Sequence, residues 1–170
     1  MLDIDGMGKA GYPWDEIIDS AAWRWKMASD KEDFLAERSI AVVGVSRTKG
    51  FGNMAFRELM KRGYQVYPVN QYATVVEGEK CYCSLNDLPG PVGGVLTVVP
   101  PAETEKVVAD CVRLGIRHVW MQQGSESEEA IRLCKENGIS AVHSACILMY
   151  ATPTSFHRFH RWVWKILGKL

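Results

Sequence analysis

The sequence has no excess of charge of either sign and no long apolar run. Twenty basic side chains balance twenty acidic ones over 170 residues. A chain without net charge gives no electrostatic reason to expect nucleic acid as its main partner, so any anion site must be local. No run reaches the length of a transmembrane helix, and the opening MLDIDGMGKAGYPWDE has acids where a signal peptide has cations. We therefore expect a cytoplasmic protein without a transmembrane segment.

The cysteines lack the pattern of a metal or redox site. Their number is odd, and no two of them have the C-x-x-C spacing of zinc and redox sites. The five cysteines are Cys81, Cys83, Cys111, Cys134 and Cys146. Because Cys111 and Cys134 fall among apolar residues of helical patterns, we expect buried thiols there, no metal site, and a reducing compartment.

Helical patterns that end in glycine alternate with β-rich runs along the middle of the chain. Helices are predicted over residues 53–62 and 101–114 and from residue 125, and they end at Gly63, Gly115 and Gly138. Ser125 and Glu128 fit a capping box at the start of the third helix. Strands are predicted over 39–45, 64–70, 94–99, 116–122 and 139–144, with one short edge strand between 72 and 91. Nearly continuous apolar strands are typical of a sheet covered on both faces.

This alternation predicts an α/β protein with a Rossmann-like, doubly wound and mainly parallel sheet. We expect residues 1–38 to form a helical extension, with helices over 15–28 and 31–38. Residues 39–150 are predicted to form the Rossmann-like domain, and 151–170 an amphipathic helix that begins near 152. Five of the six tryptophans lie in the flanking segments: Trp14, Trp23, Trp25, Trp162 and Trp164. Since exposed indoles are costly, we expect these segments to pack on each other, on the outer helices, or across a homodimer or protein partner. The basic C-terminal helix also suits a membrane surface.

The loop after the first predicted strand is the main candidate site. It lies within IAVVGVSRTKGFGNMAF, residues 40–56. Gly44 allows a tight turn and a close approach of a ligand to the backbone. Asn53 can cap the following helix, whose free N–H groups favour an anion. The loop adds hydroxyls, cations and flexibility through Ser46, Thr48, Arg47, Lys49, Gly50 and Gly52. This combination indicates a phosphate or pyrophosphate site.

Two common nucleotide motifs are absent from this loop. The fingerprint G-x-G-x-x-G fails, because Ser46 and Lys49 stand where its second and third glycines would be. The second strand ends in Asn70 and Gln71, without the acid that holds the ribose of NAD. No Gly-Lys-Ser/Thr follows the loop, as a P-loop requires. These absences argue against ordinary NAD binding and against hydrolysis of a nucleoside triphosphate.

Four segments, in this order, resemble a known family. They are VVGVSRTKGFGN, YQVYPVN, VVPPAETEKVV and HVWMQQGSESEEAI. Together they are similar to the stand-alone CoA-binding domain proteins, relatives of the N-terminal domain of the succinyl-CoA synthetase alpha subunit. The resemblance covers residues 39–150, and it implies that the ligand is coenzyme A or an acyl-CoA.

The resemblance also implies which residues bind the cofactor. The loop that meets the CoA pyrophosphate corresponds to Gly44, Val45, Ser46, Arg47, Thr48 and Lys49. The loop's own residue pattern adds Gly52 and Asn53 to the predicted cofactor-binding residues. Asn70 and Gln71 correspond to the strand end beside the adenosine and its phosphate, and Val99, Pro100 and Pro101 correspond to the wall beside the adenine. The pantetheine path corresponds to Met121, Gln122, Gln123 and Gly124.

Some of these residues also have simpler structural explanations. Pro101 suits the first position of a helix, and Asn70 suits a turn. The chain departs from the family at the end of the second strand, because the usual Val-Asn-Pro-Lys reads Val-Asn-Gln-Tyr at residues 69–72. Lys49 or Lys80 could replace the missing lysine at the 3′-phosphate.

The sequence assigns no reaction. His143 and Cys146 follow the last strand closely, and an imidazole beside a thiol can form a thiolate. A buried cysteine near a satisfied histidine is the simpler interpretation. The first hypothesis is therefore a CoA-binding protein without catalysis of its own. The second is an acyl-CoA-utilising enzyme or subunit, in which Cys146 with His143, or a partner, supplies the chemistry. A third is NADP binding, with Arg47 and Lys49 at the 2′-phosphate.

Overall fold

A sheet of five parallel strands organises the molecule. The computed structural model describes residues 29–151. The strands are β1 (Ser39–Val43), β2 (Gln65–Val69), β5 (Gly94–Thr97), β6 (His118–Gln122) and β7 (Ser140–Ala145), in the order β2-β1-β5-β6-β7. The chain runs from β1 out to β2 and then returns to β5 on the other side of β1. The strand order therefore reverses between β1 and β5, which is where open parallel sheets bind ligands.

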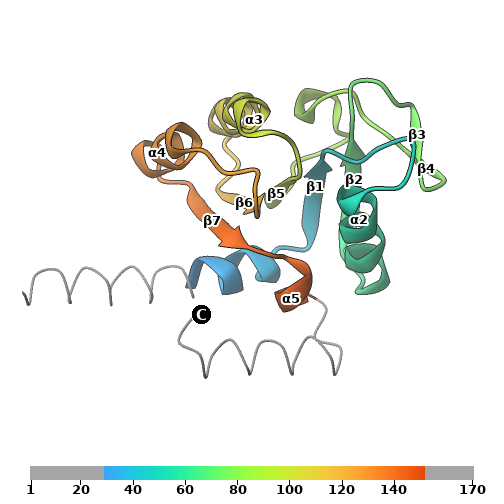
Figure 1. Ribbon diagram of the computed structural model, residues 1–170, viewed down its shortest axis with the longest axis horizontal. Coiled ribbons are helices and arrows are strands. Elements are labelled where there is room, and N and C mark those ends of the chain that lie inside the picture. Colours follow the sequence, from blue (N-terminus) through green and yellow to red (C-terminus); the bar gives the residue numbers. More distant parts are fainter. Residues whose placement is uncertain (1–28, 152–170) are drawn as a thin grey trace, which may run out of the picture.

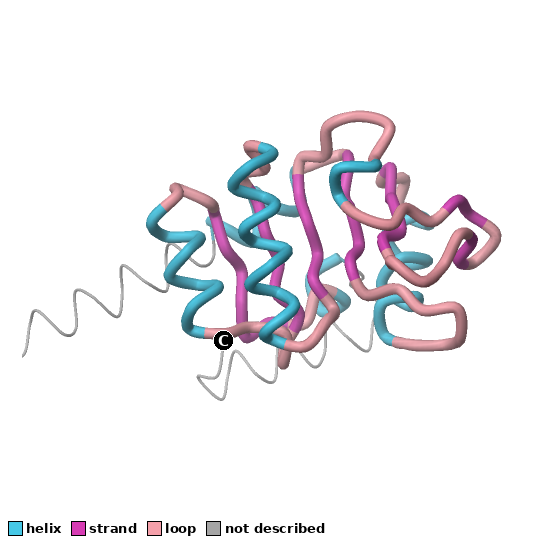
Figure 2. Tube along the Cα trace, turned by 90° about the horizontal axis from the view of Figure 1, so that it is seen from above, coloured by secondary structure: helices cyan, strands magenta, loops and turns pink. Residues whose placement is uncertain are grey.

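Helices cover both faces of this sheet (Figure 1). Helices α3 (Pro101–Leu114) and α4 (Glu128–Glu136) lie on one face. Helices α2 (Phe51–Lys61) and α5 (Leu148–Ala151) and a helix over residues 29–36 lie on the other. Figure 2 shows the same layers from above, with α3 and α4 in front of the strands. The predicted Rossmann-like α/β fold is confirmed.

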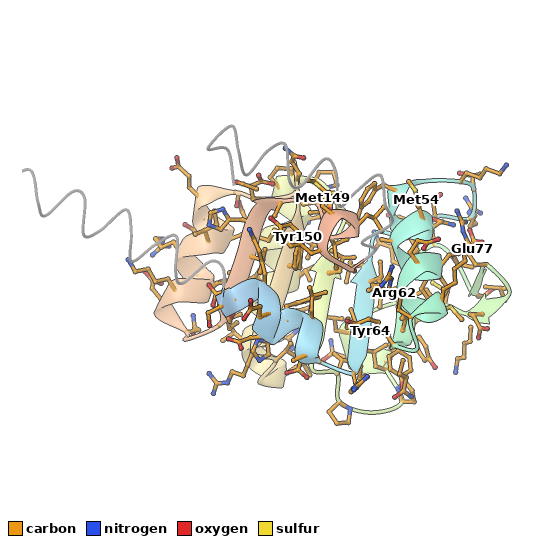
Figure 3. The ribbon with its side chains drawn as sticks, turned by 90° about the horizontal axis from the view of Figure 1, so that it is seen from below. Met54, Arg62, Tyr64, Glu77, Met149 and Tyr150 are labelled. Atoms are coloured by element: carbon orange, nitrogen blue, oxygen red, sulfur yellow. The ribbon has the colours of Figure 1, made fainter. Side chains whose placement is uncertain are left out.

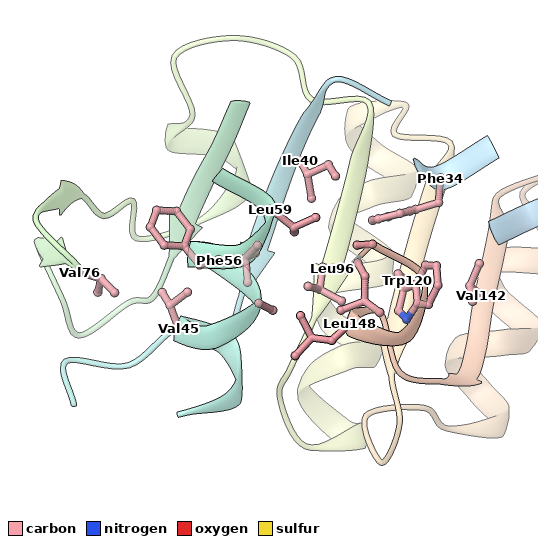
Figure 4. Close-up of a cluster of buried hydrophobic side chains, with 14 of the residues drawn as sticks. Phe34, Ile40, Val45, Phe56, Leu59, Val76, Leu96, Trp120, Val142 and Leu148 are labelled. Carbon is pink, nitrogen blue, oxygen red and sulfur yellow. The ribbon is translucent and has the colours of Figure 1, made fainter. Parts of the chain in front are cut away.

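Alternate residues of the central strands point to opposite faces and build two cores. On β1, Ile40 and Val42 belong to the cluster that contains Phe56 of α2 (Figure 4). Ala41, between them, belongs to the cluster that contains Val108 of α3. All five side chains are fully buried. The continuous apolar run of β1 is therefore explained by burial on both faces.

The helix over residues 29–36 is part of the first core. Phe34 is 1% exposed, and its ring centroid lies 5.5 Å from that of Trp120 on β6 (Figure 4). A Cβ on Gly94 of β5 would meet the Phe34 ring at 2.9 Å, so the ring packs directly on the strand backbone. The helix corresponds to the one predicted over 31–38, and it ends at residue 36, two residues earlier than predicted.

Two predicted helix caps are wrong. The N-cap residue of α2 is Gly50, so Asn53 lies within the first turn of the helix. The N-cap residue of α4 is Ser127, whose hydroxyl accepts from the amide of Ala130 at 3.0 Å, and Ser125 lies outside the helix. Each region offers several capping residues close together, and local propensity does not choose among them.

The connection after β2 also differs from the prediction. Instead of one edge strand, it forms a hairpin of β3 (Val75–Val76) and β4 (Glu79–Lys80), followed by the short 3-10 helix η1 (Leu85–Asp87). Glu77 and Gly78, at the tip, have φ values of 53° and 85°, which a two-residue type I′ turn requires. Tyr82 forms only an isolated bridge with Val69 of β2.

The predictions for the two flanking segments lie largely outside the described residues. These include the helices over 15–28 and from residue 152 onward, and the five flanking tryptophans. The domain boundaries at residues 38 and 150 stay predictions. Within residues 29–151, no helix has the length and apolarity needed to cross a membrane.

Candidate functional site

A cavity of about 320 Å³ opens where β1, β2 and β5 end. Its apolar lining is Val43, Val69, Leu85, Val99 and Val107, and its polar lining is Asn70, Gln71, Tyr72, Cys83, Ser84, Glu103, Lys106 and Asp110, beside the backbone of Gly44. Ligand pockets usually measure roughly 300–1,000 Å³, so this cavity suits one nucleoside-sized part of a larger ligand. Four predicted cofactor-binding residues line it: Gly44, Asn70, Gln71 and Val99.

Gly44 and Gly52 make a close backbone contact at the mouth of the crevice. Gly44 has φ 105°, and a Cβ on it would lie 2.2 Å from the carbonyl oxygen of Val98. A Cβ on Gly52 would lie 2.4 Å from the carbonyl oxygen of Gly44. Any side chain at either position would therefore push apart β5, the loop and the start of α2.

Asn53 holds the loop from inside α2. Its side chain is 2% exposed. Its Oδ1 accepts from the Ser46 amide at 2.8 Å, and its Nδ2 donates to the Ser46 carbonyl at 2.9 Å and to Glu77 Oε1 at 3.0 Å. Both N–H groups and the oxygen of the Asn53 amide are hydrogen-bonded within the protein. Asn53 therefore fixes the conformation of the loop.

Glu77 links the hairpin to α2. Figure 3 shows it at the tip of the hairpin, on the side of α2. Besides Asn53, it accepts from Arg57 Nη1 at 2.7 Å. The hydrogen bonds from Asn53 and from Arg57 hold the pKa of the Glu77 carboxyl below its ordinary value. The carboxylate therefore stays ionised and joins three segments: the loop, α2 and the hairpin.

The loop itself presents polar groups beside the start of α2. Ser46 Oγ and Thr48 Oγ1 lie 3.1 Å apart, and the Thr48 amide donates to Ser46 Oγ at 3.2 Å. Arg47 and Lys49 are exposed. Among the described residues, no side chain caps the first turn of α2. The free amides and the dipole of this helix end, with two cations nearby, favour an anion.

Two predicted site residues have structural roles at this end of the sheet. Val45 is 1% exposed and belongs to the core on the α2 side. Asn70 Nδ2 donates to the Val45 carbonyl, and Asn70 Oδ1 accepts from the Tyr72 amide at 2.7 Å. Asn70 therefore forms the turn that was one of its two interpretations, and it also lines the cavity.

Ser125 holds the strand end at Val99, a role that the sequence did not indicate. Ser125 is 4% exposed; its hydroxyl donates to the Val99 carbonyl at 2.7 Å and accepts from the Val99 amide at 3.1 Å. Pro100 is the N-cap residue of α3 and Pro101 is its first residue. The simpler interpretation of the two prolines, as a helix start, is thus confirmed.

The predicted pantetheine segment lies at the end of β6 and does not line the cavity. Met121 is fully buried in the core on the α3 side, and Gln122 is 7% exposed. Gln122 Oε1 accepts from the Ile147 amide at 3.2 Å. Gln123 is exposed, and Gly124, with φ 91°, donates its amide to Glu126 Oε2 at 2.7 Å. Among these four residues, only Gln123 and Gly124 are exposed.

Helix α3 forms one wall of the cavity. The sequence predicted this helix but not its place in the site. Glu103, Lys106, Val107 and Asp110 line the cavity at positions i, i+3, i+4 and i+7, which is one face of a helix. The signal was present: a helix that begins directly after Pro100 must run along the crevice. Glu103, Lys106 and Asp110 are not among the residues that the sequence predicts to bind the cofactor.

The described cysteines and histidines lie in different surroundings. Burial raises the pKa values of Cys111 and Cys134 to about 12, which confirms their role as buried apolar side chains. His143 Nδ1 lies 3.3 Å from Ser144 Oγ, and burial lowers the His143 pKa. Cys146 packs against the first core. Residues 29–151 contain no group of three His, Cys, Asp or Glu side chains suited to a metal ion.

Two solved structures with this arrangement come from archaea of the genus Pyrococcus. A conserved hypothetical protein from Pyrococcus furiosus is 37% identical, with a TM-score of 0.62 over 65% of this chain and 97% of that one. A hypothetical protein from Pyrococcus horikoshii is 31% identical, with a TM-score of 0.66 over 72% of this chain and 87% of that one.

Curated relatives include both short and long proteins. An uncharacterized protein of Bacillus subtilis is 30% identical over 71% of this chain and 90% of its own length. The ADP-forming acetate–CoA ligase II of Archaeoglobus fulgidus is 34% identical over 59% of this chain, which spans only 15% of the ligase. The model of the CoA binding domain matches residues 38–152, which is more than half of the chain. The predicted resemblance is confirmed: the chain belongs to the family of CoA binding domain proteins.

Proposed function

We propose that this chain binds coenzyme A or an acyl-CoA at the carboxyl ends of β1, β2 and β5. One observation carries the proposal: in a chain of the CoA binding domain family, the cavity opens beside Gly44, where the strand order reverses. This reversal is the general ligand site of open parallel sheets.

Each part of the ligand has a proposed place. The pyrophosphate lies at the loop and the start of α2, at Gly44, Val45, Ser46, Arg47, Thr48 and Lys49, with Gly52 and Asn53 shaping that surface. The adenosine lies in the cavity beside Asn70, Gln71, Val99, Pro100 and Pro101. The pantetheine arm runs toward Met121, Gln122, Gln123 and Gly124. Contacts there use mainly the backbone and Gln123, because Met121 and Gln122 are buried.

A second candidate is a subunit or domain of an acyl-CoA-utilising enzyme. It is favoured by the similarity to ADP-forming acetate–CoA ligases, of which this chain matches 15% in one case and 28% in another. In that case a partner, or Cys146 with His143, supplies the chemistry. Any turnover of an acyl-CoA that disappears in Cys146→Ser would favour this candidate over a binding protein without catalysis. NADP binding at Arg47 and Lys49 is a weaker alternative.

The proposal includes a cytoplasmic location and a homodimer or protein partner at the flanking segments. All five cysteines are free thiols, which suits a reducing compartment. Light scattering of the purified full chain tests the dimer directly: a mass of one chain at micromolar concentration would exclude it.

Ligand titration tests the proposed function. Thermal unfolding is followed with CoA, acetyl-CoA, NAD and NADP, because a ligand at 100 times its Kd stabilises the native state by about 2.7 kcal/mol. We expect CoA or acetyl-CoA to raise the melting temperature and NAD and NADP to leave it unchanged. No shift with either CoA compound at millimolar concentration would overturn the proposal.

A charge-matched pair of variants locates the site. Arg47→Ala with Lys49→Ala removes the two loop cations, and calorimetry should show a Kd for CoA about tenfold higher. Lys61→Ala with Arg62→Ala removes two cations from the far end of α2 and should leave the Kd unchanged. Equal increases in the Kd for CoA in both double variants would mean that binding depends only on the net charge of the protein.

A further inference from the structure

The cavity carries an unusual charge pattern for the nucleotide end of CoA. Among the described residues that line it, Lys106 is the only cation, and Glu103 and Asp110 are acids. Lys106 Nζ is already paired with Glu103 Oε1 at 2.8 Å. The hydrogen bond to Glu103 restrains the Lys106 side chain and raises its pKa. The lining side chains therefore sum to one negative charge.

Within residues 29–151, the elements that border the cavity do not supply a further unpaired cation to its lining. At the end of β2, the lining residues are Asn70, Gln71 and Tyr72, all uncharged. On the opposite wall, Ser84 Oγ donates to the carboxylate of Asp87 at 2.7 Å, which brings a further acid close. Arg113 is nearby on α3, but it is paired with Asp110.

The two lysines expected to replace the family lysine lie outside this cavity. Neither Lys49 nor Lys80 is among its lining residues. Lys80 Nζ instead lies over the ring of Tyr82, 5.0 Å from its centroid. Lys49 belongs to the exposed loop at the start of α2, where we place the pyrophosphate.

We infer that this cavity accepts the adenosine of a CoA-type ligand without its ribose 3′-phosphate. The inference deepens the proposed function and rests on it. Among the described residues, a phosphate dianion at this rim would meet the carboxylates of Glu103 and Asp110, and the two cations beside it, Lys106 and Arg113, are already paired with those acids. Ribose hydroxyls, in contrast, are donors that carboxylates and amide oxygens accept. The ring of Tyr72, which is 73% exposed at the rim, is free to stack on a base.

The ligand class that follows is an adenosine 5′-diphosphate with a free 3′-hydroxyl and a pantetheine arm. Dephospho-CoA has this chemistry and differs from CoA only in the 3′-phosphate. NAD shares the adenosine diphosphate part but has no pantetheine arm. These three compounds therefore separate the contribution of each end of the ligand.

Calorimetric titration of the full chain with CoA, dephospho-CoA and NAD tests the inference. Dephospho-CoA should bind at least as tightly as CoA, and its advantage should grow at low ionic strength, where charges are less screened. CoA that binds more than about twofold tighter than dephospho-CoA overturns the inference and leaves the proposed function intact. Binding of neither CoA compound overturns the proposed function itself.

Two variants reverse the predicted preference. Tyr72→Lys places an ammonium at an exposed rim position and should shift the ratio of affinities toward CoA by about fivefold, the effect of one accessible ion pair. Glu103→Gln with Asp110→Asn removes the repulsion and should shift it in the same direction. Glu129→Gln is the control, because this acid is paired in the same i,i+3 manner with Arg132 but lies on α4. An unchanged ratio in both test variants would show that a 3′-phosphate does not sit near this rim, and would overturn the inference.

Discussion

Gly52 lies so close to Gly44 that a Cβ on Gly52 would stand 2.4 Å from the Gly44 carbonyl oxygen. The atom that it would meet belongs to the backbone, so no side chain can rotate away to relieve the contact. This contact brings the start of α2 directly against the turn that ends β1. The free amides of the helix therefore lie close to Gly44, which lines the cavity.

Gly52→Ala should weaken both the fold and the site. The added methyl group forces α2 away from the loop, and overpacking of this kind costs about 1–3 kcal/mol. Urea unfolding measures the loss of stability, and calorimetry measures the accompanying loss of CoA affinity. Gly90→Ala is the matched control, since a Cβ there has no atom within 4 Å. Equal stability of the two variants would contradict the close contact.

Glu77→Gln should destabilise the protein in a pH-dependent way. The hydrogen bonds from Asn53 and Arg57 lower the pKa of Glu77 in the folded state. A lowered pKa adds stability that is fully present above the unfolded pKa, about 4.3 for glutamate, and is lost as the pH falls through the folded pKa. Wild type should therefore be more stable than the variant at pH 7, and the difference should disappear in acid.

Urea unfolding at pH 7 and at pH 3 measures this difference. Glu79→Gln, an exposed acid in the same hairpin, controls for general effects of charge removal. If the difference in free energy of unfolding between wild type and Glu77→Gln stays constant from pH 7 to pH 3, the carboxylate charge at this position does not contribute to stability.

Cys83 should report ligand binding chemically. It is exposed and lines the cavity, whereas Cys81, two residues earlier, is 6% exposed and burial raises its pKa. A thiol reagent at pH 8 should therefore modify Cys83 first, and saturating acetyl-CoA, whose sulfur is blocked as a thioester and does not consume the reagent, should slow that reaction about tenfold or more. Peptide mapping identifies the modified residue. Labelling of Cys83 at the same rate with and without bound acetyl-CoA would place the ligand outside the cavity.

The sequence predicts the sheet better than it predicts the wall of the site. The central strand β1 is a continuous apolar run after Ser39, and burial on both faces produces that pattern directly, as Ile40 and Ala41 illustrate. Gly44 was also identified, because a turn with φ 105° and a backbone contact at 2.2 Å leaves few alternatives to glycine. In these cases one local constraint determines the residue type.

The remaining features depend on contacts between distant segments. Asparagine is a residue type typical of a helix N-cap. The Asn53 side chain instead bonds Ser46 and also Glu77, which lies 24 residues away in a hairpin that the sequence did not predict. Ser125 likewise binds Val99, 26 residues away. No local pattern distinguishes these roles from capping, since the same side-chain oxygens and amides serve both.

Phe34→Ala should destabilise the domain strongly, although residue 34 precedes the predicted domain boundary. The ring is 1% exposed and packs on Trp120 and on the backbone of Gly94. Loss of a buried phenylalanine costs about 3–5 kcal/mol, which is a large part of the stability of an ordinary domain. Leu114→Ala is the control, because Leu114 is 42% exposed and surface changes usually stay within about 0.5 kcal/mol. Urea unfolding of the two variants decides whether the folded unit begins before residue 38: a similar small effect of both would show that the helix over residues 29–36 is dispensable.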